Sequence, residues 1–102
     1  MNQVKTLTFY SKTTKKLNRL IRRIETHKQT LLDTVSKKEF RSKESVVLQE
    51  FVNIETIEKQ LIAIQQFDIF QSHHELCLEM LEHAKISYNG TIVDLQKHFL
   101  TL

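Results

Sequence analysis

Apolar residues recur at intervals of three and four along most of this chain, which is the spacing of one face of an α-helix. In the first such stretch the residues that share one face are Tyr10, Leu17, Leu20, Ile21, Ile24, Leu31 and Val35. The pattern predicts four helices, from about Ser11 to Ser36, Ser42 to Gln66, His73 to Tyr88 and Ile92 to Leu100. The expected fold class is therefore all-α.

Local signals place the ends of these helices. Two stretches, Ser36–Glu39 and Ser72–Glu75, have the spacing of a capping box, in which a serine oxygen accepts an unpaired backbone N–H of the first turn. Gly90 follows Tyr88 and Asn89 and is the expected stop of the third helix, because glycine readily adopts the left-handed conformation found at helix ends. The second and third helices either continue as one or are separated within Gln65–Gln71, and a break is favoured because Ser72 is a suitable cap.

Composition supports a few long helices with short connections. The 102 residues contain no proline and one glycine, whereas a chain rich in β-strands needs many turn residues. Short links between sequential helices make neighbours antiparallel. The expected fold is a single domain, residues 1–102, that forms an antiparallel helical bundle of three longer helices plus a short C-terminal helix. Either the chain buries its apolar stripes alone, or a second chain completes the bundle as a dimer.

Charge is unevenly distributed along the chain. Residues 1–43 hold 12 basic and 3 acidic side chains, a net of +9, whereas residues 44–102 hold 3 basic and 9 acidic, a net of −6. Such a division is typical of a protein that neutralises itself or that presents a basic surface to an anionic partner.

The basic residues of the first predicted helix lie on one of its faces. At about 100° per residue they occupy a sector of roughly 120°, opposite the apolar residues, and extend over roughly 16 Å. The residues of this stripe are Lys12, Lys15, Lys16, Arg19, Arg22 and Arg23.

Three interpretations of the stripe remain open at this point. It can be a solvated face neutralised by Glu44, Glu50, Glu55 and Glu58 of the second helix. It can bind nucleic-acid backbone, since it is dense and contains three arginines. It can also contact an anionic membrane surface or an acidic protein. No helix-turn-helix, zinc-finger or RNA-recognition pattern is present, so contacts to phosphates without base selection are the expected mode.

A second class of function is protein–protein interaction, with the chain as an adaptor, chaperone, immunity or inhibitor protein. This hypothesis rests on an apolar bundle face around Phe67, Ile69 and Phe70, three large apolar side chains within four positions. It predicts an exposed apolar patch and a protein partner.

Enzymatic function is not expected. Cys77 lies between two leucines, and this apolar setting is expected to leave its thiol unreactive. One glycine is too few for a phosphate-binding loop. The segment from Ser72 to His83 is rich in histidine and glutamate, but no facing helix offers matching ligands, so neither a metal nor a cofactor is expected. Arg22 and His27 match the R-x4-H spacing of HEPN ribonucleases, yet they lie about 140° apart on a helix.

No segment approaches the ~20 apolar residues that a membrane span requires. Nothing near the N-terminus has the apolar run of a signal peptide. A cytoplasmic location is therefore expected.

Overall fold

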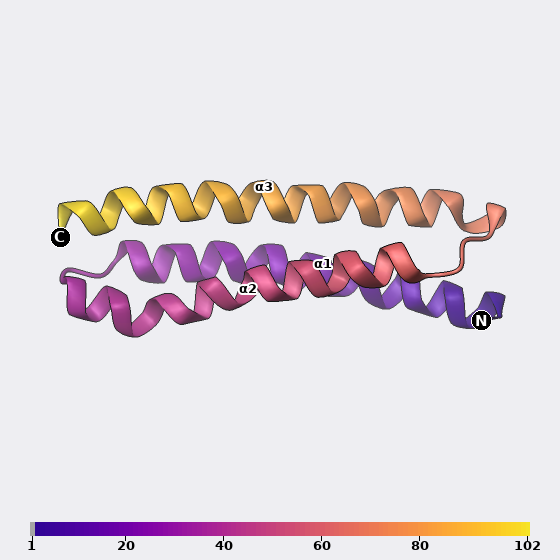
Figure 1. Ribbon diagram of the computed structural model, residues 1–102, viewed down its shortest axis with the longest axis horizontal. Coiled ribbons are helices and arrows are strands. Elements are labelled where there is room, and N and C mark those ends of the chain that lie inside the picture. Colours follow the sequence, from indigo (N-terminus) through magenta and orange to yellow (C-terminus); the bar gives the residue numbers. More distant parts are fainter. Residues whose placement is uncertain (1) are drawn as a thin grey trace.

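A computed structural model describes residues 2–102 as three long helices and one short 3₁₀ turn. The elements are α1 (Gln3–Leu32), α2 (Lys37–Ala63), η1 (Asp68–Phe70) and α3 (Gln71–Thr101). Figure 1 shows the helices side by side, with α1 and α3 running in one direction and α2 in the other, so the two termini lie at opposite ends. The bundle measures 52 × 18 × 17 Å. No strand occurs in residues 2–102, and the all-α helical bundle is confirmed.

Helix α1 begins eight residues before the predicted start at Ser11. The side chain of Asn2 caps it by accepting a hydrogen bond from the backbone N–H of Lys5 at 2.8 Å. Two of the buried positions in its N-terminal half are threonines, Thr6 and Thr13, which interrupt the apolar pattern in the sequence. The hydroxyl of Thr6 donates to the backbone carbonyl of Asn2, so this polar group is satisfied although the residue is buried.

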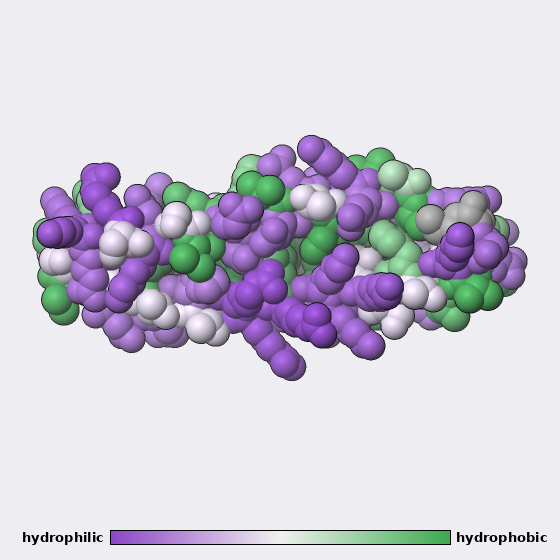
Figure 2. Space-filling view, turned by 90° about the horizontal axis from the view of Figure 1, so that it is seen from below, coloured by the Kyte–Doolittle hydropathy of each residue, from purple (hydrophilic) through white to green (hydrophobic). Residues whose placement is uncertain are grey.

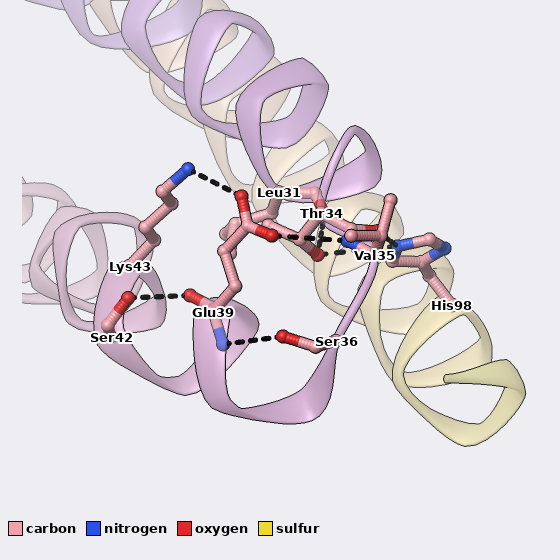
Figure 3. A network of polar contacts seen from close by, with 8 residues as sticks. All are labelled: Leu31, Thr34, Val35, Ser36, Glu39, Ser42, Lys43 and His98. Atoms are coloured by element: carbon pink, nitrogen blue, oxygen red, sulfur yellow. Dashed lines mark hydrogen bonds and ion pairs between the residues drawn. The ribbon is translucent and has the colours of Figure 1, made fainter.

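The connection between α1 and α2 confirms that Ser36 caps α2, but Glu39 bonds to Val35 and not to Ser36 as a full capping box requires. Ser36 Oγ accepts from the backbone N–H of Glu39 at 3.2 Å, while the Glu39 carboxylate accepts from the backbone N–H of Val35. Figure 3 shows Glu39 held between that N–H and the ammonium of Lys43. From α3, His98 Nε2 donates to the backbone carbonyl of Thr34 at 3.0 Å, which fastens the connection to the neighbouring helix.

The break between α2 and α3 is confirmed, but its predicted cause is wrong. Helix α2 ends at Ala63, and Ile64 adopts an extended conformation. Ser72 lies inside the first turn of α3 and does not cap it, because that helix begins after Phe70 without a side-chain cap.

The predicted short C-terminal helix is also wrong. Helix α3 continues from Gln71 to Thr101, and Gly90 lies in its interior without a positive φ. Nothing lies within 4 Å of the position that a Cβ would take at Gly90. The regular packing of Tyr88, Thr91 and Leu95 against the other helices continues across this residue and overrides the local preference of glycine.

Replacing Gly90 with alanine is therefore expected to raise the free energy of unfolding by about 0.5–1 kcal/mol. Glycine inside a helix loses more backbone entropy on folding than alanine does, and here the added methyl group meets no neighbour. Urea unfolding followed by circular dichroism measures the change. A loss of stability would contradict a continuous α3 and would support a helix end at residue 90.

The core has a larger and a smaller part. The larger cluster contains Tyr10, Leu17, Leu20, Ile24, Ile54, Ile57, Leu61, Ile64, Phe70, Cys77, Leu81, Ala84 and Tyr88. The smaller cluster, at the end of the bundle that holds the C-terminus, contains Leu31, Phe40, Val47 and Leu95. Polar groups inside this core are accommodated, since no buried side-chain nitrogen or oxygen in residues 2–102 lacks a hydrogen-bond partner.

Candidate nucleic-acid interface

The six predicted cations of α1 are all exposed. Because the helix begins at Gln3, it also includes Lys5, which at 100° per residue falls within the same sector. The line of charges thus extends over about 27 Å from Lys5 to Arg23. We call the following residues the cationic face: Lys5, Lys12, Lys15, Lys16, Arg19, Arg22 and Arg23.

One side of α2 carries uncharged polar side chains, and its part from Gln49 to Gln60 lies beside the cationic face. These side chains recur at intervals of seven, four, three and four, so they share one side of the helix. The residues of this stripe are Ser42, Gln49, Asn53, Thr56 and Gln60. Figure 2 views the molecule from the side opposite α3 and shows hydrophilic side chains projecting over the middle of this surface.

A groove of about 260 Å³ separates the two helices at this place. Its α1 wall holds Lys16, Arg19 and Arg23. Its α2 wall holds amide and hydroxyl groups that can donate hydrogen bonds, and its floor is apolar. The lining residues combine cations with neutral donors and include no carboxylate. Such a surface is suited to bind phosphate oxygens.

The acids of α2 leave most of the cationic face unneutralised. At 100° per residue Glu44, Glu55 and Glu58 lie on the side of α2 opposite the uncharged stripe. Glu58 forms an ion pair with Lys85 of α3, and Glu44 lines a groove between α2 and α3. These carboxylates therefore face α3 and solvent rather than α1.

One member of the cationic face has an acidic partner. Arg23 Nη2 lies 3.2 Å from Glu50 Oε2, and the two side chains are 45% and 5% exposed. Asn53 Nδ2 also donates to Glu50 Oε1 at 2.9 Å. In residues 2–102 no ion pair joins the other six cations of the face to an acid. Neutralisation by the second helix is thus limited to Arg23.

The three residues considered for a protein contact do not share one surface. Phe70 is buried in the core, and Phe67 is half-buried and packs against it. Ile69 is 65% exposed. A larger apolar groove lies elsewhere, between α2 and α3, with a volume of about 450 Å³.

The histidines at the start of α3 contribute to packing. The hydroxyl of Tyr10 lies 2.8 Å from His74 Nδ1, and the ring of His73 packs against Tyr10 and Phe70. Residues 2–102 contain no group of three or more histidine, cysteine or acidic side chains placed to hold a metal ion. Burial raises the pKa of the Cys77 thiol, which keeps it protonated and weakly nucleophilic.

Comparison of this chain with protein-family models, with curated proteins and with solved structures gives no match. Within residues 2–102, no helix is both long and apolar enough to cross a membrane. The surfaces of the bundle are therefore the remaining guide to its function.

Two parts of the interface were missed in the sequence. Lys5 was omitted because the threonines near it hid the first two turns of α1. The stripe from Ser42 to Gln60 was omitted because its residues are uncharged and do not alter the charge distribution along the sequence. Its regular spacing was the signal that could have revealed it.

Proposed function

We propose that this protein binds nucleic-acid backbone through its cationic face and catalyses no reaction. It would act in the cytoplasm as a dimeric accessory or regulatory protein. The observation that carries this proposal is the exposure of six cations that have no acidic partner within residues 2–102, beside a groove whose lining residues include no carboxylate. Such a surface attracts a polyanion and releases its condensed counterions.

The shape of the bundle supports contacts to phosphates rather than to bases. Its cross-section of 18 × 17 Å exceeds the width of the DNA major groove, about 12 Å, so the bundle as a whole cannot enter that groove. A straight row of cations about 27 Å long matches about eight base pairs along the helix axis. Binding is therefore proposed to be independent of base sequence.

The experiment is a fluorescence anisotropy titration of a labelled 20-base-pair duplex at 50 mM salt. The variant Lys12→Gln/Arg19→Gln removes two exposed cations of the face. Its affinity is expected to fall on the order of 10- to 100-fold, because each lost phosphate contact reduces counterion release. Arg23 is left unchanged, because its loss would leave the buried Glu50 without its ion pair.

The matched control is Lys59→Gln/Lys97→Gln. It also lowers the net charge of the chain by two, at exposed lysines outside the cationic face. Its affinity is expected to stay close to that of the unchanged protein. Equal losses in both variants would mean that net charge alone attracts the duplex, and an absence of binding would overturn the proposal.

A second candidate function, protein–protein interaction, is favoured by one observation. The groove between α2 and α3 is apolar, and Leu48 and Leu100 on its walls are 48% and 79% exposed. Exposed apolar surface of this kind is typical of contact sites for other protein chains. This candidate now depends on that groove rather than on Phe67, Ile69 and Phe70.

A further inference from the structure

The bundle exposes more surface than a compact protein of its mass. Its accessible area is 6729 Å², whereas a compact monomer of 12.1 kDa exposes about 6,000 Å². Its radius of gyration of 16.4 Å likewise exceeds the roughly 13 Å expected for this length. The excess of about 700 Å² is close to the ~800 Å² that each partner buries in a standard protein interface.

Much of the exposed apolar surface lies over α2 and α3. On α2, Leu48, Phe51 and Ile62 share one side of the helix with Glu44 and Glu55. Phe51 packs its ring against Tyr88 of α3, which places this side of α2 next to α3. The groove of about 450 Å³ continues the surface toward the start of α2, where Val47 and Leu48 face the α3 residues around Phe99.

Charge is divided between the two ends of this surface. At the end with the groove, Lys37 and Arg41 lie over the ring of Phe99 at 5.3 and 5.0 Å. Toward the other end the same sides of α2 and α3 carry the acids Glu55, Glu75 and Glu82. The exceptions are Glu44 near the basic end and Lys59 near the acidic end, while Glu58 and Lys85 neutralise each other.

We propose that the occupant of this groove is a second copy of the chain, packed antiparallel through α2 about a two-fold axis near Leu48. Such a contact is self-complementary, because the basic end of one copy meets the acidic end of the other. A parallel arrangement would bring like charges together.

The spacing of residues on α2 gives the register. Arg41, Leu48 and Glu55 are each seven residues apart and lie on one side of the helix. When two α2 helices align antiparallel on Leu48, Arg41 of each copy is opposite Glu55 of the other, so the two-fold axis creates this pair twice. The same alignment brings Lys37 near Lys59 at the rim of the contact, where water and salt weaken the repulsion.

The proposed function also includes a dimer, but the contact through α2 does not depend on nucleic-acid binding. The cationic face lies on α1, away from the α2–α3 groove, and stays accessible whether or not two chains associate. A dimer would carry two such faces, and the strength of binding to a long duplex would rise through their linkage.

Sedimentation equilibrium of the full chain at about 5–200 µM tests the proposal, because the affinities of standard interfaces range from micromolar to picomolar. A dimer of twice 12.1 kDa is expected. Arg41→Glu and Glu55→Arg are each expected to weaken association at least tenfold, and the double variant Arg41→Glu/Glu55→Arg is expected to restore it, because the swap regenerates opposite charges.

Leu48→Glu provides a second test, because Leu48 is half-exposed and the monomer should keep its fold, as circular dichroism can verify. This variant is expected to be monomeric. A monomeric unchanged protein at 200 µM would mean that the groove takes a different chain and would overturn the proposal. It is equally overturned if Leu48→Glu and Arg41→Glu leave a dimer intact, or if the charge swap fails to restore association.

Discussion

Replacing Leu17 with alanine is expected to lower the free energy of unfolding by about 3 kcal/mol. Leu17 is 0% exposed and lies in the larger core cluster. Its truncation removes apolar contacts and leaves a cavity that straight, closely packed helices cannot easily close. A small domain has a total stability of about 5–15 kcal/mol, so this change should lower the melting temperature by about 15 °C.

Urea unfolding of Leu17→Ala and of a matched control measures this effect. The control is Leu76→Ala on α3, since Leu76 is partly exposed and outside both core clusters. Its expected loss is about 0.5 kcal/mol. Equal losses at the two positions would contradict the assignment of Leu17 to the core and of the buried side of α1.

Substitution of Arg23 by glutamine is expected to lower the free energy of unfolding by about 2 kcal/mol. This change removes the cation beside Glu50, which is 5% exposed, so that only neutral amides such as that of Asn53 can donate to it from side chains. Removing the cation from a buried ion pair strongly destabilises the folded state, because an uncompensated charge remains buried. The expected value is below the range for fully buried pairs, because Arg23 itself is half-exposed.

Substitution of the acidic partner, Glu50→Gln, is expected to lower the free energy of unfolding by less than Arg23→Gln does. In Glu50→Gln the arginine can turn to water, and a neutral amide at position 50 can still accept from Asn53. The double variant Arg23→Gln/Glu50→Gln should therefore be about as stable as Glu50→Gln alone. A double-mutant cycle by urea unfolding at pH 7 measures this. Strictly additive losses would contradict a pair whose penalty comes from burial of the carboxylate.

Helical periodicity was sufficient to predict the class of fold and the main buried positions. On the predicted apolar face of the first helix, the residues buried in the core are Tyr10, Leu17, Leu20, Ile24 and Leu31. The prediction for Val35 was wrong, because α1 ends at Leu32 and Val35 is 83% exposed. The cap at Ser36 was also predictable, because the short link after α1 leaves local hydrogen bonding to determine where α2 begins.

Predictions failed where packing overrides local preference. Gly90 and Ser72 have residue types typical of helix ends, yet both lie inside α3, whose buried residues continue from Cys77 to Leu95. The start of α1 was predicted too late for a related reason. Thr6 and Thr13 are polar residues that are buried, so they interrupt the apolar pattern there. Sequence periodicity alone does not say which neighbour covers a given position.

The candidate site was predicted in part for the same reason. Spacing within α1 correctly placed six cations on one exposed side of one helix. Whether α2 would neutralise them depended on the rotation of α2 about its own axis, which is set by core contacts between distant residues. That rotation pairs Glu50 with Arg23 and turns Glu44, Glu55 and Glu58 away from α1.

The most direct test of the cationic face is the salt dependence of duplex binding. For the unchanged protein, anisotropy titrations between about 50 and 200 mM KCl should show log K falling against log salt with a slope of about −4 to −5, as four to six phosphate contacts require. Lys12→Gln/Arg19→Gln should reduce the magnitude of this slope by about two. A slope near zero, or no binding at 50 mM salt, would contradict the proposed binding of nucleic-acid backbone.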